Sequence, residues 1–254
     1  MGELELGNGK RLDRIAGRNP VLEALAAGRK IERLLLATGA KVDDVQDQAA
    51  RRGVPVEIVD RHYLDALVKT LHQGVVAFAE PLEYASTEDI LDVATGRKEP
   101  AMIVALDQLE DPQNLGSILR SSDAFGAHGV IILERRSVSL SPAVSRASAG
   151  AVEHVRVARI VNMARELDSL KREGLWVIGL DGAGDQVLWT VDLTSPVVIV
   201  VGGEGRGLRR LVKEKCDVIA RIPMAGRVSS LNAGVAAALA LYEAQRQRNA
   251  LIRK

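Results

Sequence analysis

The chain contains 254 residues, carries a formal net charge of +1 at pH 7 and has a single cysteine, Cys216. This length is sufficient for two domains with a buried core, and one cysteine excludes an intrachain disulfide. The four histidines have no cysteine or histidine partner at metal-ligand spacing, so we expect no metal. No apolar run is long enough to cross a membrane, and the N-terminal segment lacks the pattern of a signal peptide. We therefore expect a cytoplasmic protein with no membrane partner.

Residues 12–80 have the pattern of a small α/β domain, in which apolar runs typical of strands alternate with helical segments. The pair Asn19-Pro20 begins a helix that Gly28 ends. The other expected elements are helices at residues 42–52 and 61–69 and strands at residues 31–37, 54–59 and 74–79. Residues 81–99 are polar and mixed, with a short helix expected at residues 87–93, and are interpreted as a linker.

From Ala101 onward, strand and helix patterns alternate as in a parallel sheet that is covered by helices on both faces. The expected strands are residues 101–106, 129–133, 175–180, 197–201 and 218–222, and the expected helices are residues 114–125, 163–173 and 231–247. In the last helix, the side chains expected to face inward are Leu231, Val235, Ala238 or Leu239, and Tyr242. Ligands of such sheets bind beyond the carboxyl ends of the strands, here at Asp107, Asp181, Gly202 and Pro223.

Two loops in the last third of the chain are typical of a ligand site. The apolar strand at residues 197–201 runs directly into residues 202–207 (GGEGRG), where glycines allow the backbone to approach a ligand closely. The glycine spacing is not that of a dinucleotide-binding loop, so it indicates a nucleotide only weakly. Residues 222–232 (IPMAGRVSSLN) then place Ser230 and Asn232 at the beginning of a helix. Two such loops so close in the sequence predict one shared pocket.

Each candidate residue also has an ordinary structural interpretation when it is considered alone. Glu204 can be a carboxylate at a helix start, and Ser230, Asn232 and Asn114 can be helix caps. Arg120, on the polar face of its helix, can be a solvated charge. The segment His72-Gln73-Gly74 can be only a turn that leads into a strand.

Considered together, three segments resemble the signature motifs of a known family. Residues 111–120 (DPQNLGSILR), 202–207 and 222–232 resemble, in order and spacing, the motifs of the SpoU/TrmH branch of the SPOUT RNA 2′-O-ribose methyltransferases. The resemblance covers residues 100–247, the expected catalytic domain. Residues 17–25 and 72–74 resemble the substrate-binding domain that precedes the catalytic domain in ribosomal-RNA members. Members that act on tRNA guanosine typically lack that domain, so the resemblance implies a guanosine-2′-O-methyltransferase of large-subunit (23S) rRNA.

The resemblance further implies a deep trefoil knot in the catalytic domain, S-adenosylmethionine (AdoMet) bound there, and a homodimer. Arg120 matches the essential arginine of the family. A guanidinium stays protonated in proteins, so holding a phosphate and supporting a developing alkoxide is a physically easier role for Arg120 than that of a base. Asn114, Glu204, Ser230 and Asn232 match the polar residues that orient Arg120 and the nucleotide.

The expected cofactor-binding residues are Leu180, Gly202, Ile222, Met224 and Leu231, with backbone groups for the adenine and ribose and apolar side chains for the walls. In the first domain, polar loop positions suited to RNA recognition are Arg18, Asn19, His72 and Gln73.

Two other classes of function remain open at this point. A nicotinamide-dependent oxidoreductase would explain a glycine-rich loop after a strand, although the glycine spacing disfavours it. A non-catalytic RNA-binding protein could use the same scaffold, but it would have no need to keep Asn114, Arg120, Glu204 and Asn232 together. The knot follows from the resemblance alone, because general rules of chain topology favour an unknotted sheet.

Overall fold

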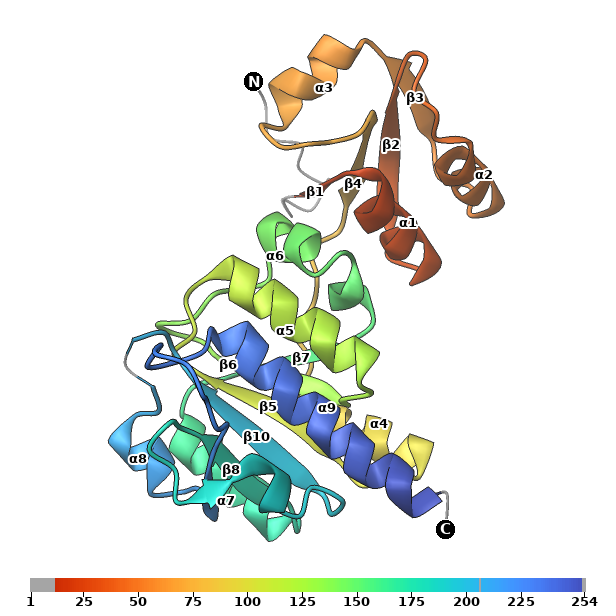
Figure 1. The fold of residues 1–254 in the computed structure, drawn as a ribbon. Helices are drawn as coiled ribbons and strands as arrows, with labels where there is room; N and C mark the ends of the chain where they lie inside the picture. Colours follow the sequence, from red (N-terminus) through yellow and green to blue (C-terminus); the bar gives the residue numbers. More distant parts are fainter. Residues whose placement is uncertain (1–11, 206, 253–254) are drawn as a thin grey trace. The chain divides into compact units, whose positions relative to one another are not determined.

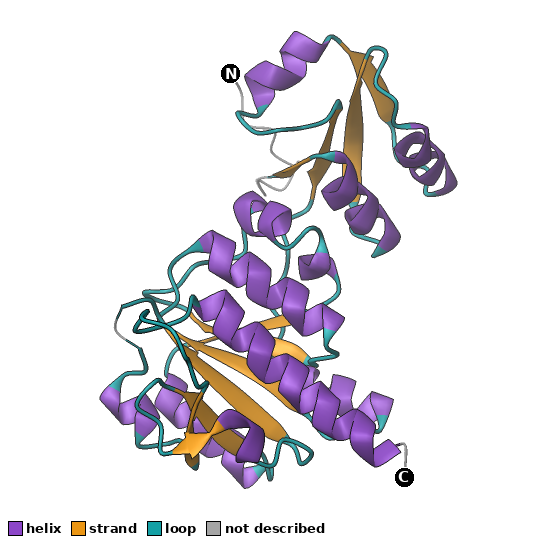
Figure 2. Cartoon of the chain, in the orientation of Figure 1, coloured by secondary structure: helices purple, strands orange, loops and turns teal. Residues whose placement is uncertain are grey.

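The computed structural model describes residues 12–205 and 207–252, so Arg206 of the glycine-rich segment lies outside the described residues. Helices and strands alternate along most of the chain (Figures 1 and 2). The chain divides into two compact units. The first comprises the described residues up to Glu83 together with Leu140–His154, and the second comprises Tyr84–Ser139 together with the chain from Val155 onward.

The first unit contains a four-stranded sheet in the order β1-β4-β2-β3. Its strands are β1 (Asp13–Ala16), β2 (Ile31–Ala37), β3 (Val56–Val59) and β4 (Val75–Ala79), and its helices include α1 (Arg18–Ala26), α2 (Asp43–Arg51) and α3 (Arg61–Leu67). Strand β4 is antiparallel to β1 and β2, whereas β2 and β3 are parallel. The expected helices and the three expected strands are confirmed to within two residues. The sequence did not predict strand β1, because two of its four residues are charged.

A segment from the second half of the chain belongs to the first unit. It contains α6 (Pro142–Ala147) and the 3-10 turn η1 (Ala151–Glu153). The guanidinium of Arg29 binds Glu153 at 2.8 Å and Asp13 at 2.6 Å, and all three groups are largely buried. Gly150 approaches α1 so closely that a Cβ there would lie 2.4 Å from Cβ of Glu23. Residues 140–154 lie within the expected domain of residues 100–247 but belong to the first unit. The second unit is therefore not continuous in the sequence.

The second unit is built on a seven-stranded sheet in the order β7-β6-β5-β10-β8-β11-β9. Its strands are β5 (Met102–Asp107), β6 (Gly129–Leu133), β7 (Arg156–Ile160), β8 (Trp176–Leu180), β9 (Gln186–Val187), β10 (Val197–Gly202) and β11 (Val218–Arg221). Every pairing between these strands is parallel. The predicted parallel α/β fold is thus confirmed, while the knot stays a prediction. Strands β7 and β9 were not anticipated.

Helices cover this sheet. They are α4 (Thr87–Arg97), α5 (Pro112–Ala124), α7 (Met163–Arg172), α8 (Arg210–Lys213) and α9 (Ala233–Ile252), with a 3-10 turn η2 (Leu188–Thr190). Helix α4 lies in the expected linker, but Ile90 and Ala94 are buried in the core of the second unit. A Ser86–Asp89 capping box fixes its start. The described helices include none that is both long and apolar enough for a membrane span.

Helix α9 faces the opposite way from the sequence-based prediction. Val235, Leu239 and Tyr242 are exposed, at 47%, 41% and 55%. The buried side is formed mainly by small residues: Ala233, Ala237, Ala240, Leu241 and Ala244. Because alanines allow close approach between helices, α9 lies against α5 and strand β10 with its small side inward (Figure 1). Apart from Leu241, the larger apolar side chains named here are left on the surface.

Candidate functional site

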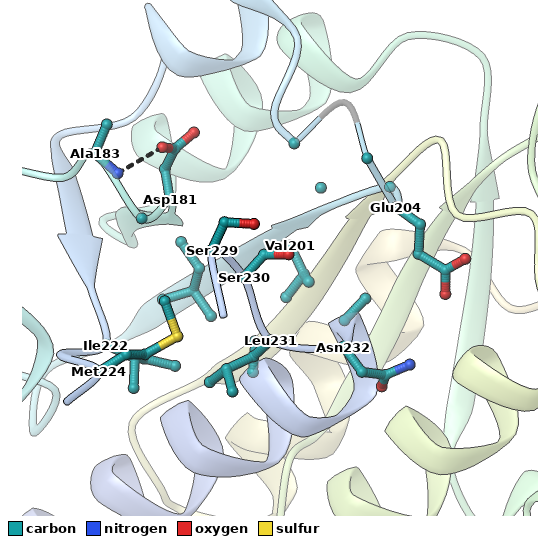
Figure 3. A pocket seen from close by; sticks show the side chains of 18 of the residues that line it. Asp181, Ala183, Val201, Glu204, Ile222, Met224, Ser229, Ser230, Leu231 and Asn232 are labelled. Atoms are coloured by element: carbon teal, nitrogen blue, oxygen red, sulfur yellow. Dashed lines mark hydrogen bonds between the residues drawn. The ribbon is translucent and has the colours of Figure 1, made fainter. Parts of the chain in front are cut away.

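A cavity of about 850 Å³ lies beyond the carboxyl ends of three adjacent strands, β10, β8 and β11 (Figure 3). The parallel register places these ends level, since Val201 pairs with Leu180 and Leu180 pairs with Ala220. The cavity is completed by the chain that leads into α9, from Ser229 to Ala233. A site at the carboxyl edge of the sheet is where the sequence predicted it.

The glycine-rich loop forms one wall of this cavity. Gly203 and Gly207 form a β-bridge in which the Gly207 N–H donates to the Gly203 carbonyl at 3.1 Å. A Cβ on Gly202 would lie 2.2 Å from the carbonyl carbon of Gly207, and one on Gly203 would lie 2.3 Å from the carbonyl oxygen of Gln108. Only glycine fits at these two positions, so this wall is mainly backbone.

Asn232 fixes the start of α9 and connects it to α5. Its Oδ1 accepts hydrogen bonds from the N–H groups of Gly234 at 2.9 Å and Val235 at 3.2 Å. Its Nδ2 donates to Oδ1 of Asn114 at 2.7 Å. The capping interpretation of Asn232 is therefore correct, and the same side chain also ties the third motif to the first.

The cavity gathers eight of the ten site residues expected in the second unit. These are Leu180, Gly202, Glu204, Ile222, Met224, Ser230, Leu231 and Asn232. In Figure 3, the apolar side chains of Ile222 and Met224 lie toward one end, and the polar side chains of Glu204 and Asn232 lie toward the other. The cavity thus has an apolar end and a polar end, as a site for an amphipathic ligand requires.

The two remaining residues, Asn114 and Arg120, do not line the cavity. Asn114 is 4% exposed, because its side of α5 packs against α9. Its Nδ2 is buried and has no hydrogen-bond partner among the described residues. Arg120 is exposed on α5. Within one chain, Arg120 is therefore not among the residues that line the cavity.

Asp181 lines the cavity, at a strand end where the sequence predicted a ligand but assigned this residue no role. It directly follows β8, and its carboxylate accepts from the Ala183 N–H at 2.9 Å and pairs with Lys213 at 2.6 Å. Burial acts to raise the pKa of this carboxyl group, but the two contacts outweigh it and hold the pKa below its usual value. Asp181 is therefore a fixed negative charge at neutral pH. Its position after a strand was the available signal.

The four expected RNA-binding residues of the first unit have different environments. His72 is 4% exposed: its Nδ1 accepts from the Gly74 N–H at 3.0 Å, and its Nε2 binds Asp65 at 2.9 Å. Gln73 accepts from the Arg18 N–H at 3.1 Å. Arg18 and Asn19 are exposed at the start of α1. His72 thus has a structural place, and Arg18 and Asn19 are the pair best placed to meet a ligand.

Within the described residues, no group of three or more histidine, cysteine or acidic side chains has the arrangement of a metal site.

Comparison with known proteins identifies the family. The pattern of the SpoU rRNA Methylase family matches residues 101–242, and that of the RNA 2′-O ribose methyltransferase substrate-binding domain matches residues 14–85. The chain therefore belongs to the SpoU/TrmH family of RNA 2′-O-ribose methyltransferases.

Individual relatives extend over nearly the whole chain. The putative TrmH family tRNA/rRNA methyltransferase YacO of Bacillus subtilis is 44% identical over 240 residues, which are 93% of this chain and 96% of the relative. The SpoU methyltransferase AviRb of Streptomyces viridochromogenes, solved with AdoMet, has a TM-score of 0.79 at 29% identity and covers 94% of this chain and 91% of its own. The AdoMet-bound rRNA methyltransferase of Sinorhizobium meliloti has a TM-score of 0.76 at 31% identity. The match covers 92% of this chain and 87% of the Sinorhizobium chain.

Replacing Gly202 by valine tests the glycine wall. The added side chain would collide with the Gly207 backbone and displace the loop from the cavity. We expect AdoMet affinity, measured by calorimetry, to fall about tenfold or more while the rest of the sheet stays folded. Gly226→Ala is the matched control, because a Cβ on Gly226 has no neighbour within 4 Å. Unchanged AdoMet affinity in Gly202→Val would place the ligand elsewhere.

Proposed function

We propose that this protein transfers the methyl group of AdoMet to the ribose 2′-hydroxyl of a guanosine in large-subunit (23S) rRNA, in the cytoplasm. The observation that carries the proposal is the convergence of the second and third motifs on one cavity at the carboxyl edge of a parallel sheet. The family gives the type of chemistry, and the cavity supports the location that we propose for it.

The residues of the cavity fit AdoMet. Its volume of about 850 Å³ is in the range of roughly 300–1,000 Å³ that small-molecule sites occupy. The backbone of Gly202, Ile222 and Leu231 offers N–H and C=O groups to an adenine and a ribose, and Leu180 and Met224 supply apolar contact. When bound, AdoMet supplies an already activated methyl group, so the protein has to align the acceptor oxygen and assist loss of its proton.

Polar groups at the other end of the cavity are suited to the nucleotide. Glu204 and Asn232 line that end of the cavity and Ser230 lines its middle, and these three residues could orient the ribose through hydrogen bonds. The buried Nδ2 of Asn114 is a free donor among the described residues, next to Asn232. Arg120 would hold a neighbouring phosphate by its planar fork and support the developing alkoxide. Because Arg120 lies outside the cavity of its own chain, this role requires bound RNA or a second chain to bring the two together.

Two comparisons favour ribosomal RNA over tRNA. The chain carries the substrate-binding domain at residues 14–85. The solved tRNA-modifying TrmH/SpoU enzyme of A. aeolicus covers only 60% of this chain, whereas the Sinorhizobium rRNA methyltransferase covers 92%. The names of curated relatives, such as that from Bacillus subtilis, include both RNA classes.

The proposed reaction can be tested with purified protein, AdoMet and either rRNA or tRNA, with the methylated nucleotide mapped afterwards. We expect a 2′-O-methylguanosine in 23S rRNA. Arg120→Ala should reduce methyl transfer by about a hundredfold or more, with stability nearly unchanged because the side chain is exposed. Arg120→Lys should not restore it, because an ammonium cannot reproduce the fork. Methylation of tRNA alone would refute the rRNA assignment, and an active Lys variant would refute the phosphate-fork role.

Selection of rRNA by the first unit can be tested at Arg18. Its ion pair with Asp44 is exposed on both sides and contributes little to stability, so Arg18→Gln should fold normally. We expect weaker rRNA binding and a shallower dependence of binding on salt, because one phosphate contact is lost. Arg165→Gln, which removes an exposed charge from α7, is the control. Equal losses in both variants would contradict a specific role for Arg18. A point substitution is preferable to deleting the N-terminal stretch up to Glu83, because that deletion would leave the buried Glu153 without Arg29.

We infer that the protein forms a homodimer through α9 and the neighbouring end of α5. Val235, Leu239 and Tyr242 form an exposed apolar side of α9, which monomeric surfaces rarely keep. The ring of Tyr242 packs edge-on against Phe125 at 5.8 Å, beside a hollow of about 530 Å³. A second copy of this chain would bury that surface by presenting the same residues in return.

Leu239→Glu tests the dimer, because two-fold pairing would bring the new carboxylates into a closing apolar surface. Light scattering should show a monomer for Leu239→Glu and a dimer for the unaltered protein. Val161→Glu, at another exposed apolar position, should leave the dimer intact. A Leu239→Glu protein that remains dimeric would exclude this face as the interface.

A further inference from the structure

Two carboxylates flank the strand that carries the glycine-rich loop. Strand β10 lies between β5 and β8 in the sheet and ends at Gly202. Asp107 is the last residue of β5 and is fully buried, and Asp181 directly follows β8 with its side chain 17% exposed. The loop therefore emerges between two largely buried negative charges.

Both carboxylates are paired with cations from the short segment that follows the loop. Arg209 donates to Asp107 from its backbone N–H at 3.0 Å and from Nε at 2.8 Å, and its Nη2 lies 2.6 Å from Oδ1. Lys213 pairs with Asp181 at 2.6 Å. The Lys213 N–H donates to the Arg209 carbonyl, so one helical turn connects the two cations. The segment after the loop is thus fixed to the strands on both sides of β10.

Backbone contacts among the described residues also determine the course of the loop. The Gly203 N–H donates to the Asp107 carbonyl at 2.9 Å, and Gly203 and Gly207 bridge across the turn. Gly205 and Gly207 adopt positive φ angles of 73° and 62°. A chain with so many glycines loses much conformational freedom when it is ordered, and its shape is therefore sensitive to how its two ends are held.

We propose that Asp107–Arg209 and Asp181–Lys213 are a paired clamp that positions the glycine wall of the cofactor cavity and the Glu204 side chain. This inference rests on the proposed function of that cavity. Arg209 and Lys213 do not line the cavity themselves, so they act through the loop and are positioning residues. The clamp holds the end of the loop at the level of the strand ends, where the backbone groups face the ligand.

Lys213 and Arg209 are the positions at which the clamp can be tested without changing the cavity lining. Lys213→Gln removes one cation from the clamp, and Arg209→Gln removes the other. Lys213→Arg keeps the charge and should behave as the unaltered protein. Asp168→Asn is the matched control, because it breaks the Lys215–Asp168 pair of 2.7 Å, whose cation lies two residues beyond Lys213 and whose carboxylate belongs to α7.

The measurements are AdoMet affinity by calorimetry, the KM for AdoMet and the kcat of methyl transfer, and thermal unfolding without ligand. For Lys213→Gln we expect AdoMet affinity to fall about tenfold and the KM for AdoMet to rise similarly, with rRNA affinity unchanged. Arg209→Gln should show the same pattern more strongly, since it leaves Asp107 buried without its cation. If Arg209→Gln does not fold, Lys213→Gln and its arginine counterpart decide.

The outcomes separate this inference from the proposed function. If the unaltered protein fails to bind AdoMet, the cofactor assignment is refuted. The proposal that the clamp positions a wall of the cofactor cavity is then refuted with it. Normal binding by the unaltered protein with unchanged affinity in Lys213→Gln would overturn the clamp alone. An equal loss of affinity in Asp168→Asn, or a loss in Lys213→Arg as large as in Lys213→Gln, would also overturn it, since either would indicate a general effect on folding.

Discussion

The reversal of the chain at the end of β10 is the constraint on which the catalytic unit depends. A Cβ at Gly202 would be 2.2 Å from the Gly207 backbone, so the chain can turn back here only without side chains. The wall that results is formed mainly by backbone, since most of its residues are glycines. The parallel register then brings Leu180 and Ala220 level with this turn, which lets two further strands contribute to the same space.

Much of the fold could be predicted from the sequence because buried parallel strands are continuous apolar runs. The run at residues 197–201 between a polar turn and a pair of glycines shows this most clearly. The orientation of α9 could not be predicted in the same way. Ala237 and Ala244 are poor markers of a buried face, yet their small size allows the helix to approach α5, while Leu239 looked like a core residue and is exposed. At the contact between α9 and α5, the small size of the side chains mattered more than their hydrophobicity in deciding which face of α9 is buried.

The site was predictable to the extent that its residues lie in short motifs. Ile222, Ser230 and Asn232 are close in sequence and converge on the cavity as expected. The pairing of Arg209 with Asp107 joins residues far apart in the chain, and no local pattern signals it. The environment of His72 was likewise not visible in its local sequence pattern. A polar residue in a turn suggested recognition, but its ring is buried and holds the turn together through Gly74 and Asp65.

The contact between Asn232 and Asn114 explains how motifs so far apart can form one site. The same amide caps α9 and holds Asn114 of α5, so the position of the first motif depends on the start of the last helix. The hydrogen bond from Asn232 reaches Asn114 but not Arg120, which lies further along α5 and is exposed. One chain therefore gathers residues of the second and third motifs around the cavity, and the catalytic site that we propose lacks Arg120 there. The exposed apolar side of α9, which is next to α5, is where a second chain could complete it.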